Sequence, residues 1–184
     1  MEDNIIRVGN GRIETTDNPK KHLITTGLDS CVGIGIKNKE NNKRDLGHLL
    51  YTGDAVYGEN RESNEIGLTD YDRGHANKFL DELLKLVNFF NPKNTKAYAV
   101  ANLFRHDFKG AEINPMLEYV VKYFKSKDIN ILVDKESTVN KRKIYWKGLV
   151  LHSESADALY YGNTVKKMSD GSYTDNLLGS KNLE

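Results

Sequence analysis

A strictly alternating segment, Val32 to Ile36 (VGIGI), constrains the fold of this chain more than any other part of its sequence. In an extended strand the branched apolar side chains share one face, while Gly33 and Gly35 share the other. Two glycines on one face indicate that another part of the chain packs very close to it. A polar loop at 38–44 follows, and Leu46 to Tyr51 then reads as a second strand. We therefore expect an antiparallel hairpin with one closely covered face.

Two further segments have the pattern of amphipathic helices. Within 74–90, apolar residues recur at spacings of three and four, which places them on one buried stripe, and Asn91-Pro92 ends the pattern. Asn114 and Pro115 form an N-cap and first-turn pair that opens a second helix. The sequence therefore predicts two main helices.

The remaining apolar runs predict strands at 22–26, 96–101, 129–133, 143–146 and 148–151. Because strands and helices mix without strict βαβ alternation, we expect an α/β sandwich with a mixed, largely antiparallel sheet. A length of 184 residues favours one domain, 1–184. After about residue 160 the chain is rich in Gly, Ser, Asn and Asp, which indicates a loosely ordered tail.

Composition excludes several classes of protein. The single cysteine rules out an internal disulfide and a structural zinc site built on two or more cysteines. A net charge of +1 gives no drive toward nucleic acid. No apolar run approaches the ~18 residues of a membrane span, and no secretory signal follows the acidic start, Met1 to Asn4. We expect a protein that works in water, either in the cytoplasm or exported without a cleaved signal, with no nucleic-acid partner and no membrane insertion.

The residues with the clearest chemical potential lie in Thr25 to Cys31 and at His48. A nucleophilic cysteine needs a nearby base, a rigid accessible turn and backbone amides directed at the oxyanion. Cys31 follows a short turn at the start of the glycine-bearing strand, and the expected hairpin brings His48 within a few residues of it. Thr25 could accept a hydrogen bond from the second imidazole nitrogen and so fix the tautomer.

These residue types alone are weak evidence, because a lone cysteine in an apolar stretch is usually an inert core residue. The chain has five histidines, so some pairing of cysteine with histidine is always available. His22, His75 and His152 are consistent with surface or satisfied side chains. His106, between Arg105 and Asp107, is the one rival base.

The order of the residues is stronger evidence for a catalytic cysteine than the residue types alone. Thr-x-Gly-Leu-x-Ser-Cys-Val, followed by an alternating strand, a polar loop and Gly-His, resembles the CheD family of chemoreceptor glutamine deamidases. The resemblance implies that Thr25, Cys31 and His48 are catalytic. Asp29 stands where the family usually has glycine, and aspartate tolerates the left-handed conformation better than most residues. The same arrangement is similar to that of bacterial deamidase toxins of the cytotoxic necrotizing factor and Burkholderia lethal factor type.

The activity that this resemblance implies is conversion of a protein glutamine to glutamate with release of ammonia, without metal or cofactor. The Cys31 N–H, helped by the Ser30 hydroxyl, is expected to stabilise the oxyanion. The protein substrate is a chemoreceptor by resemblance to CheD, or a host protein if the chain is an exported toxin or effector. A non-catalytic binding module of the same fold and a cysteine peptidase or amidase acting on a small substrate are the rival hypotheses.

Overall fold

The strands of the protein divide between two sheets. The computed structural model describes residues 4–51, 68–88, 91–102, 114–136, 138–163, 166–169 and 173–184. The central sheet has the order β2 (Ile13–Thr16), β5 (Arg44–Leu49), β4 (Val32–Asn38), β6 (Thr95–Ala101) and β7 (Asn130–Val133). The outer sheet has the order β1 (Ile5–Arg7), β3 (His22–Leu28), β10 (Trp146–Leu151), β11 (Ala156–Tyr161) and β14 (Leu177–Asn182). Two short strand pairs add β8 (Thr138–Val139) with β9 (Arg142–Lys143), and β12 (Lys166–Lys167) with β13 (Tyr173–Thr174).

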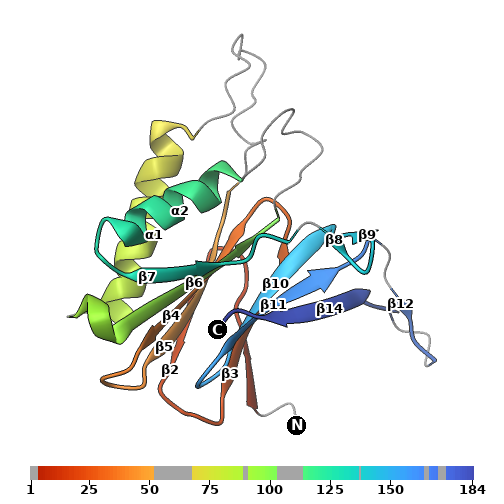
Figure 1. Cartoon of the computed structure of the whole chain (residues 1–184), viewed down its shortest axis with the longest axis horizontal. Coiled ribbons are helices and arrows are strands. Elements are labelled where there is room, and N and C mark those ends of the chain that lie inside the picture. The colour runs from red at the N-terminus through yellow and green to blue at the C-terminus, as the bar shows by residue number, and fades with distance from the viewer. Residues whose placement is uncertain are drawn as a thin grey trace.

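The expected α/β fold with a mixed, largely antiparallel arrangement and two main helices is confirmed. Among the described strands, only β1 with β3 and β6 with β7 pair in parallel. Helices α1 (Asp70–Leu86) and α2 (Pro115–Lys125) lie beside the central sheet, and the outer sheet lies on its other side (Figure 1). The sequence did not predict that the strands would separate into two facing sheets.

The central sheet is buried on both faces, and this explains its glycines. Every residue of β4 and β5 is buried, as expected for strands with a layer on either side. A Cβ placed on Gly33 would lie 2.7 Å from Leu28 Cδ1 of the outer sheet. On the opposite face, a Cβ on Gly47 would lie 2.6 Å from Phe79 Cε1 of α1. The glycine face of β4 is therefore covered closely, as the alternation predicts.

Helix α1 begins four residues earlier than the apolar stripe predicts. Thr69 is the N-cap and forms a capping box with Asp72, so the first turn is stabilised by polar side chains that the stripe does not include. The helix ends at Leu86, before Asn88 with a φ of 54°. Asn91-Pro92 instead opens the short 3-10 helix η2 (Pro92–Asn94). The prediction for α2 is confirmed, because Asn114 is its N-cap and Pro115 its first residue.

The expectation of a loosely ordered tail is wrong for the last residues. Leu177 to Asn182 forms β14, which pairs antiparallel with β11 at the edge of the outer sheet. The strand was missed because most of its side chains are exposed, so it lacks the alternation that marks a strand with one buried face. The sequence analysis did not predict the short strands β1 and β2 or the six-residue strand β11 either.

Asp45 is an ionisable residue buried among these layers, and it gives a prediction about stability. It lies on β5 and is 0% exposed, and its carboxylate has the Thr15 side chain of β2 nearby but no hydrogen bond of regular geometry. Burial raises the pKa of Asp45 to about 7, although Thr15 and Lys43 act in the opposite direction. Since the unfolded carboxyl has a pKa near ~3.9, its contribution to stability is complete below about pH 4 and is lost as the pH rises through about 7.

Asp45→Asn is therefore expected to raise the free energy of unfolding at pH 8 by up to about 4 kcal/mol, and to change it little at pH 4. Chemical denaturation at both pH values measures the difference. Glu82→Gln, at an exposed position on α1, removes one negative charge without burial and serves as the control. An equal effect of Asp45→Asn at pH 4 and pH 8 would contradict this account.

Candidate functional site

Thr25 and His48 are in contact between the two sheets, and Cys31 lies in the turn through which the chain passes from the outer sheet to the central sheet. Thr25 lies on β3, Cys31 ends the turn that follows β3, and His48 lies on β5. Gly33 pairs directly with His48 in the β4–β5 ladder. Cys31 precedes Gly33 by two residues, so the ladder directs Cys31 and His48 to the same face of the central sheet. That face is turned toward β3 and Thr25.

The Thr25 hydroxyl contacts both the imidazole and the backbone. Thr25 Oγ1 lies 2.8 Å from His48 Nδ1 and donates its proton to the Val8 carbonyl oxygen at 3.0 Å. Because the hydroxyl has only one proton and gives it to Val8, it can only accept from the imidazole. His48 Nδ1 therefore carries the ring proton, and Nε2 presents a lone pair. The expected hydrogen bond between Thr25 and His48 is present, while the role of the Val8 carbonyl has no signal in the sequence.

The imidazole of His48 is held neutral and out of contact with solvent. His48 is 1% exposed, and its burial lowers the pKa of the imidazole below the ordinary value of 6.5. Nε2 is buried and has no hydrogen-bond partner. A neutral ring with a free, oriented lone pair is the state that a general base requires.

Cys31 is half-buried and packs at the edge of the apolar layer between the sheets. If the β4–β5 register is extended by one residue, Cys31 is diagonal to His48, at a spacing of about 7–8 Å that aromatic side chains can reach across. His48 Nε2 makes no hydrogen bond to the sulfur, so a transfer of the thiol proton to it would require the two side chains to move closer. Ser30 is half-buried beside it in the same turn.

The turn before Cys31 uses glycine at a position that requires it. Gly27 has a φ of 73°, a left-handed conformation that disfavours side chains. The Asp29 N–H donates to the Gly27 carbonyl oxygen at 2.9 Å and closes the turn. Asp29 itself has no positive φ, so a side chain at this position places no backbone strain on the turn.

Asn114 holds the turn from the other side, which the sequence did not predict. Its Nδ2 donates to the Ser30 carbonyl oxygen at 2.9 Å, while its Oδ1 accepts from the N–H groups of Met116 and Leu117 at 3.0 and 3.2 Å. In a trans peptide the carbonyl and the following N–H point in opposite directions. Fixing the Ser30 carbonyl therefore fixes the direction of the Cys31 N–H. From the sequence, Asn114 was recognised only as a helix cap.

We expect Asn114→Ser to separate these two roles. Serine is a good N-cap but has no amide to donate to Ser30, so any catalytic turnover that depends on Cys31 should fall by about tenfold or more, with a small loss of stability. Asn114→Ala removes the cap as well and should lower the melting temperature further. Kinetics and thermal melting of both variants measure this. Turnover in Asn114→Ser equal to that of the unaltered protein would show that the Ser30 contact is only structural.

Two other histidines form hydrogen-bond contacts with each other and lie outside this site. His152 Nδ1 lies 3.1 Å from His22 Nδ1, and His152 Nε2 lies 2.9 Å from Asp157 Oδ2. His75 stacks on Tyr71 along α1. The rival base His106 lies outside the described residues.

The described part of the chain has neither a cluster of metal-binding side chains nor a membrane-spanning helix. No group of three or more His, Cys, Asp or Glu side chains there is arranged to hold a metal ion. None of the helices there is long and apolar enough to cross a membrane.

Comparisons with known proteins identify no family for the chain. No protein-family model matches the chain, and no curated protein matches its sequence. Among solved structures it is similar to the hypothetical protein YfiH of Bacillus licheniformis, with a TM-score of 0.41 and 14% sequence identity. The similarity covers 66% of this chain and 49% of that one, so the chain spans about half the length of this neighbour.

Proposed function

We propose that the protein is a cysteine-dependent protein-glutamine deamidase, with Cys31 as nucleophile, His48 as base and Thr25 as the residue that orients the base. The observation that carries this proposal is the position of Thr25 Oγ1 between His48 Nδ1 and the Val8 carbonyl. A threonine in this position leaves Nε2, which is buried and has no hydrogen-bond partner, as the basic nitrogen. A buried histidine with a merely structural role is expected to use both ring nitrogens in hydrogen bonds.

In the proposed reaction His48 Nε2 takes the thiol proton and Cys31 Sγ bonds to the side-chain amide carbon of glutamine. The carbonyl oxygen becomes an oxyanion that accepts from the Cys31 N–H, with the Ser30 hydroxyl as a second donor. His48 returns the proton to the amide nitrogen, and ammonia leaves as the carbon–nitrogen bond breaks. Water then gives a proton to Nε2 and attacks the thioester, which releases glutamate and restores the thiol.

The substrate class follows from the resemblance to CheD, which favours a chemoreceptor glutamine. An exported effector that deamidates a host protein uses the same chemistry and is the alternative. In both cases the product gains a negative charge, so the reaction can act as a switch.

Trapping of the thioester tests the reaction directly. The protein is incubated with a glutamine-rich protein and a fluorescent primary amine, which competes with water for the acyl group. We expect ammonia release together with fluorescence on glutamine side chains, and loss of both with Cys31→Ala. Ammonia release that persists in Cys31→Ala would exclude the mechanism.

Alkylation tests the same pair without a substrate. Because the chain has one cysteine, every adduct with iodoacetamide reports on Cys31. We expect labelling of the folded protein near neutral pH, and labelling slower by about tenfold in His48→Ala, since the ring no longer accepts the thiol proton. His75→Ala, on α1, is the control. Labelling that requires denaturant would identify Cys31 as an inert core residue and favour a non-catalytic binding module.

A further inference from the structure

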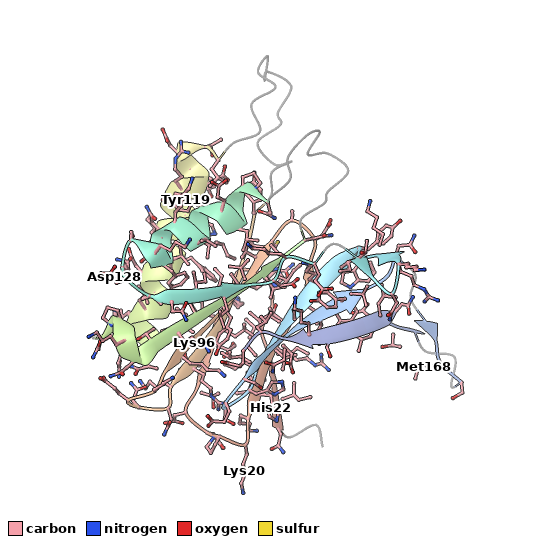
Figure 2. The ribbon with its side chains drawn as sticks, in the orientation of Figure 1. Lys20, His22, Lys96, Tyr119, Asp128 and Met168 are labelled. Atoms are coloured by element: carbon pink, nitrogen blue, oxygen red, sulfur yellow. The ribbon has the colours of Figure 1, made fainter. Side chains whose placement is uncertain are left out.

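A second group of charged side chains lies at the end of the sandwich opposite to Cys31. Lys37 lies near the far end of β4, six residues beyond Cys31, which at the rise of an extended chain is about 20 Å away. It borders a pocket of about 520 Å³ between the β4–β5 hairpin, the start of β6 and the segment that joins β10 to β11. Figure 2 labels Lys96 and His22 at this end of the molecule. The volume is that of a site for a small molecule.

The lining of the pocket favours anions. Five basic and three acidic side chains contribute to it; the basic residues are Lys37, Lys39, Lys43, Arg44 and Lys96. Lys37 is mostly buried, and its Nζ donates to the Ser155 carbonyl oxygen at 2.7 Å. Burial lowers the pKa of Lys37 to about 8, so the ammonium is still charged at neutral pH, and a nearby anion stabilises that charge.

Arg44 is the least satisfied of these cations. It is 3% exposed, and its Nη2 donates to the Asn18 carbonyl oxygen, while Nη1 is buried without a hydrogen-bond partner. Within the described residues no carboxylate forms an ion pair with it, although Asp17 and Glu154 also line the pocket. A guanidinium remains charged at any accessible pH, so an unpaired buried N–H is costly until an acceptor reaches it.

The carboxylate of Glu184 lies in the pocket and contacts some of its basic residues. The side chain of Glu184 forms an ion pair with Lys96 and accepts from the Tyr98 hydroxyl. One of its oxygens lies 4.0 Å from Lys37 Nζ. An ammonium, a phenol and a second ammonium thus converge on one oxyanion, which is the arrangement that a phosphate or carboxylate group of a ligand requires.

We propose that this pocket binds a small molecule through an oxyanion group, either a phosphate or a carboxylate, and that Glu184 competes with this ligand for Lys96 and Tyr98. The site is separate from Cys31 and does not depend on the proposed deamidation. Arg44 supplies a directional donor, and the lysines around it supply the positive potential.

Calorimetric titration with inorganic phosphate, pyrophosphate and citrate, at an ionic strength matched with sodium chloride, tests the proposal. We expect at least one of these anions to bind with a dissociation constant of about 1 mM or lower. Preference for phosphate and pyrophosphate identifies a phosphate group, and preference for citrate identifies a carboxylate. If none of them binds more strongly than chloride, the proposal is wrong.

Variants locate the binding. Lys39→Gln with Lys43→Gln should weaken it by about tenfold or more, while Lys78→Gln with Lys85→Gln, the same charge change on the exposed face of α1, should leave it unchanged. Arg44→Lys keeps the charge and should still weaken binding; the lysine pair replaces it as the test if that variant fails to fold. Glu184→Gln should strengthen binding severalfold. Equal losses in both lysine pairs, or an unchanged affinity in Glu184→Gln, would overturn the assignment.

Discussion

Replacing Cys31 with serine is expected to abolish ammonia release from a glutamine-bearing protein while leaving the melting temperature almost unchanged. The hydroxyl is nearly isosteric with the thiol, so the packing at the edge of the inter-sheet core is kept. It is, however, a far poorer nucleophile with an imidazole that is adapted to a thiol. We expect turnover to fall by a factor on the order of a thousand or more, as found for loss of a nucleophile in related chemistry.

The control for this experiment lies one residue away. Ser30→Ala removes the hydroxyl that is proposed to assist the oxyanion, but it keeps the Ser30 carbonyl that Asn114 holds and the following N–H. Ser30→Ala should therefore lower turnover less than Cys31→Ser does. Full ammonia release by Cys31→Ser, with thermal melting showing both variants folded, would refute cysteine catalysis in this protein.

Local patterns were sufficient for some of the elements that pack against their neighbours in sequence, although not for β11, which pairs with β10. The alternation of Val32 to Ile36 predicted both the hairpin, in which Ile34 pairs with Gly47, and its closely covered face. The Asn114-Pro115 pair gave the start of α2. In each case the residues of one buried face recur with the period of the element, so the local sequence is enough to predict which face is buried.

Features that depend on distant partners could not be predicted in this way. Nothing in Thr25 to Cys31 shows that β3 and β4 belong to different sheets, because a strand in either sheet has the same alternation. The contact of Asn114 with Ser30 joins residues 84 positions apart, and the cap alone fully explains an asparagine there. Lys96, Tyr98 and Glu184 likewise meet only because β14 returns along the outer sheet. Such contacts follow from the topology, which local periodicity does not specify.

The two threonines of β3 provide the sharpest test of how His48 is oriented. Thr25 is 1% exposed and contacts the imidazole, whereas Thr26, the next residue along the strand, is half-buried and directed to the other face. Thr25→Ala removes the acceptor for Nδ1–H in a site where His48 has almost no contact with solvent. The ring can then change its tautomer or rotate, and either change misdirects Nε2.

We expect Thr25→Ala to lower turnover by a factor on the order of ten to a thousand, less than His48→Ala, because the base is misoriented but still present. Thr25→Ser keeps the hydroxyl between Nδ1 and the Val8 carbonyl and should recover much of the loss. Thr25→Val keeps the shape that packs over Gly33 but has no hydroxyl, so it should not recover the lost turnover. Thr26→Ala is the matched control and should be nearly silent. Recovery by valine as well as by serine would mean that Thr25 acts through packing, and a silent Thr25→Ala beside a damaging Thr26→Ala would remove Thr25 from the site.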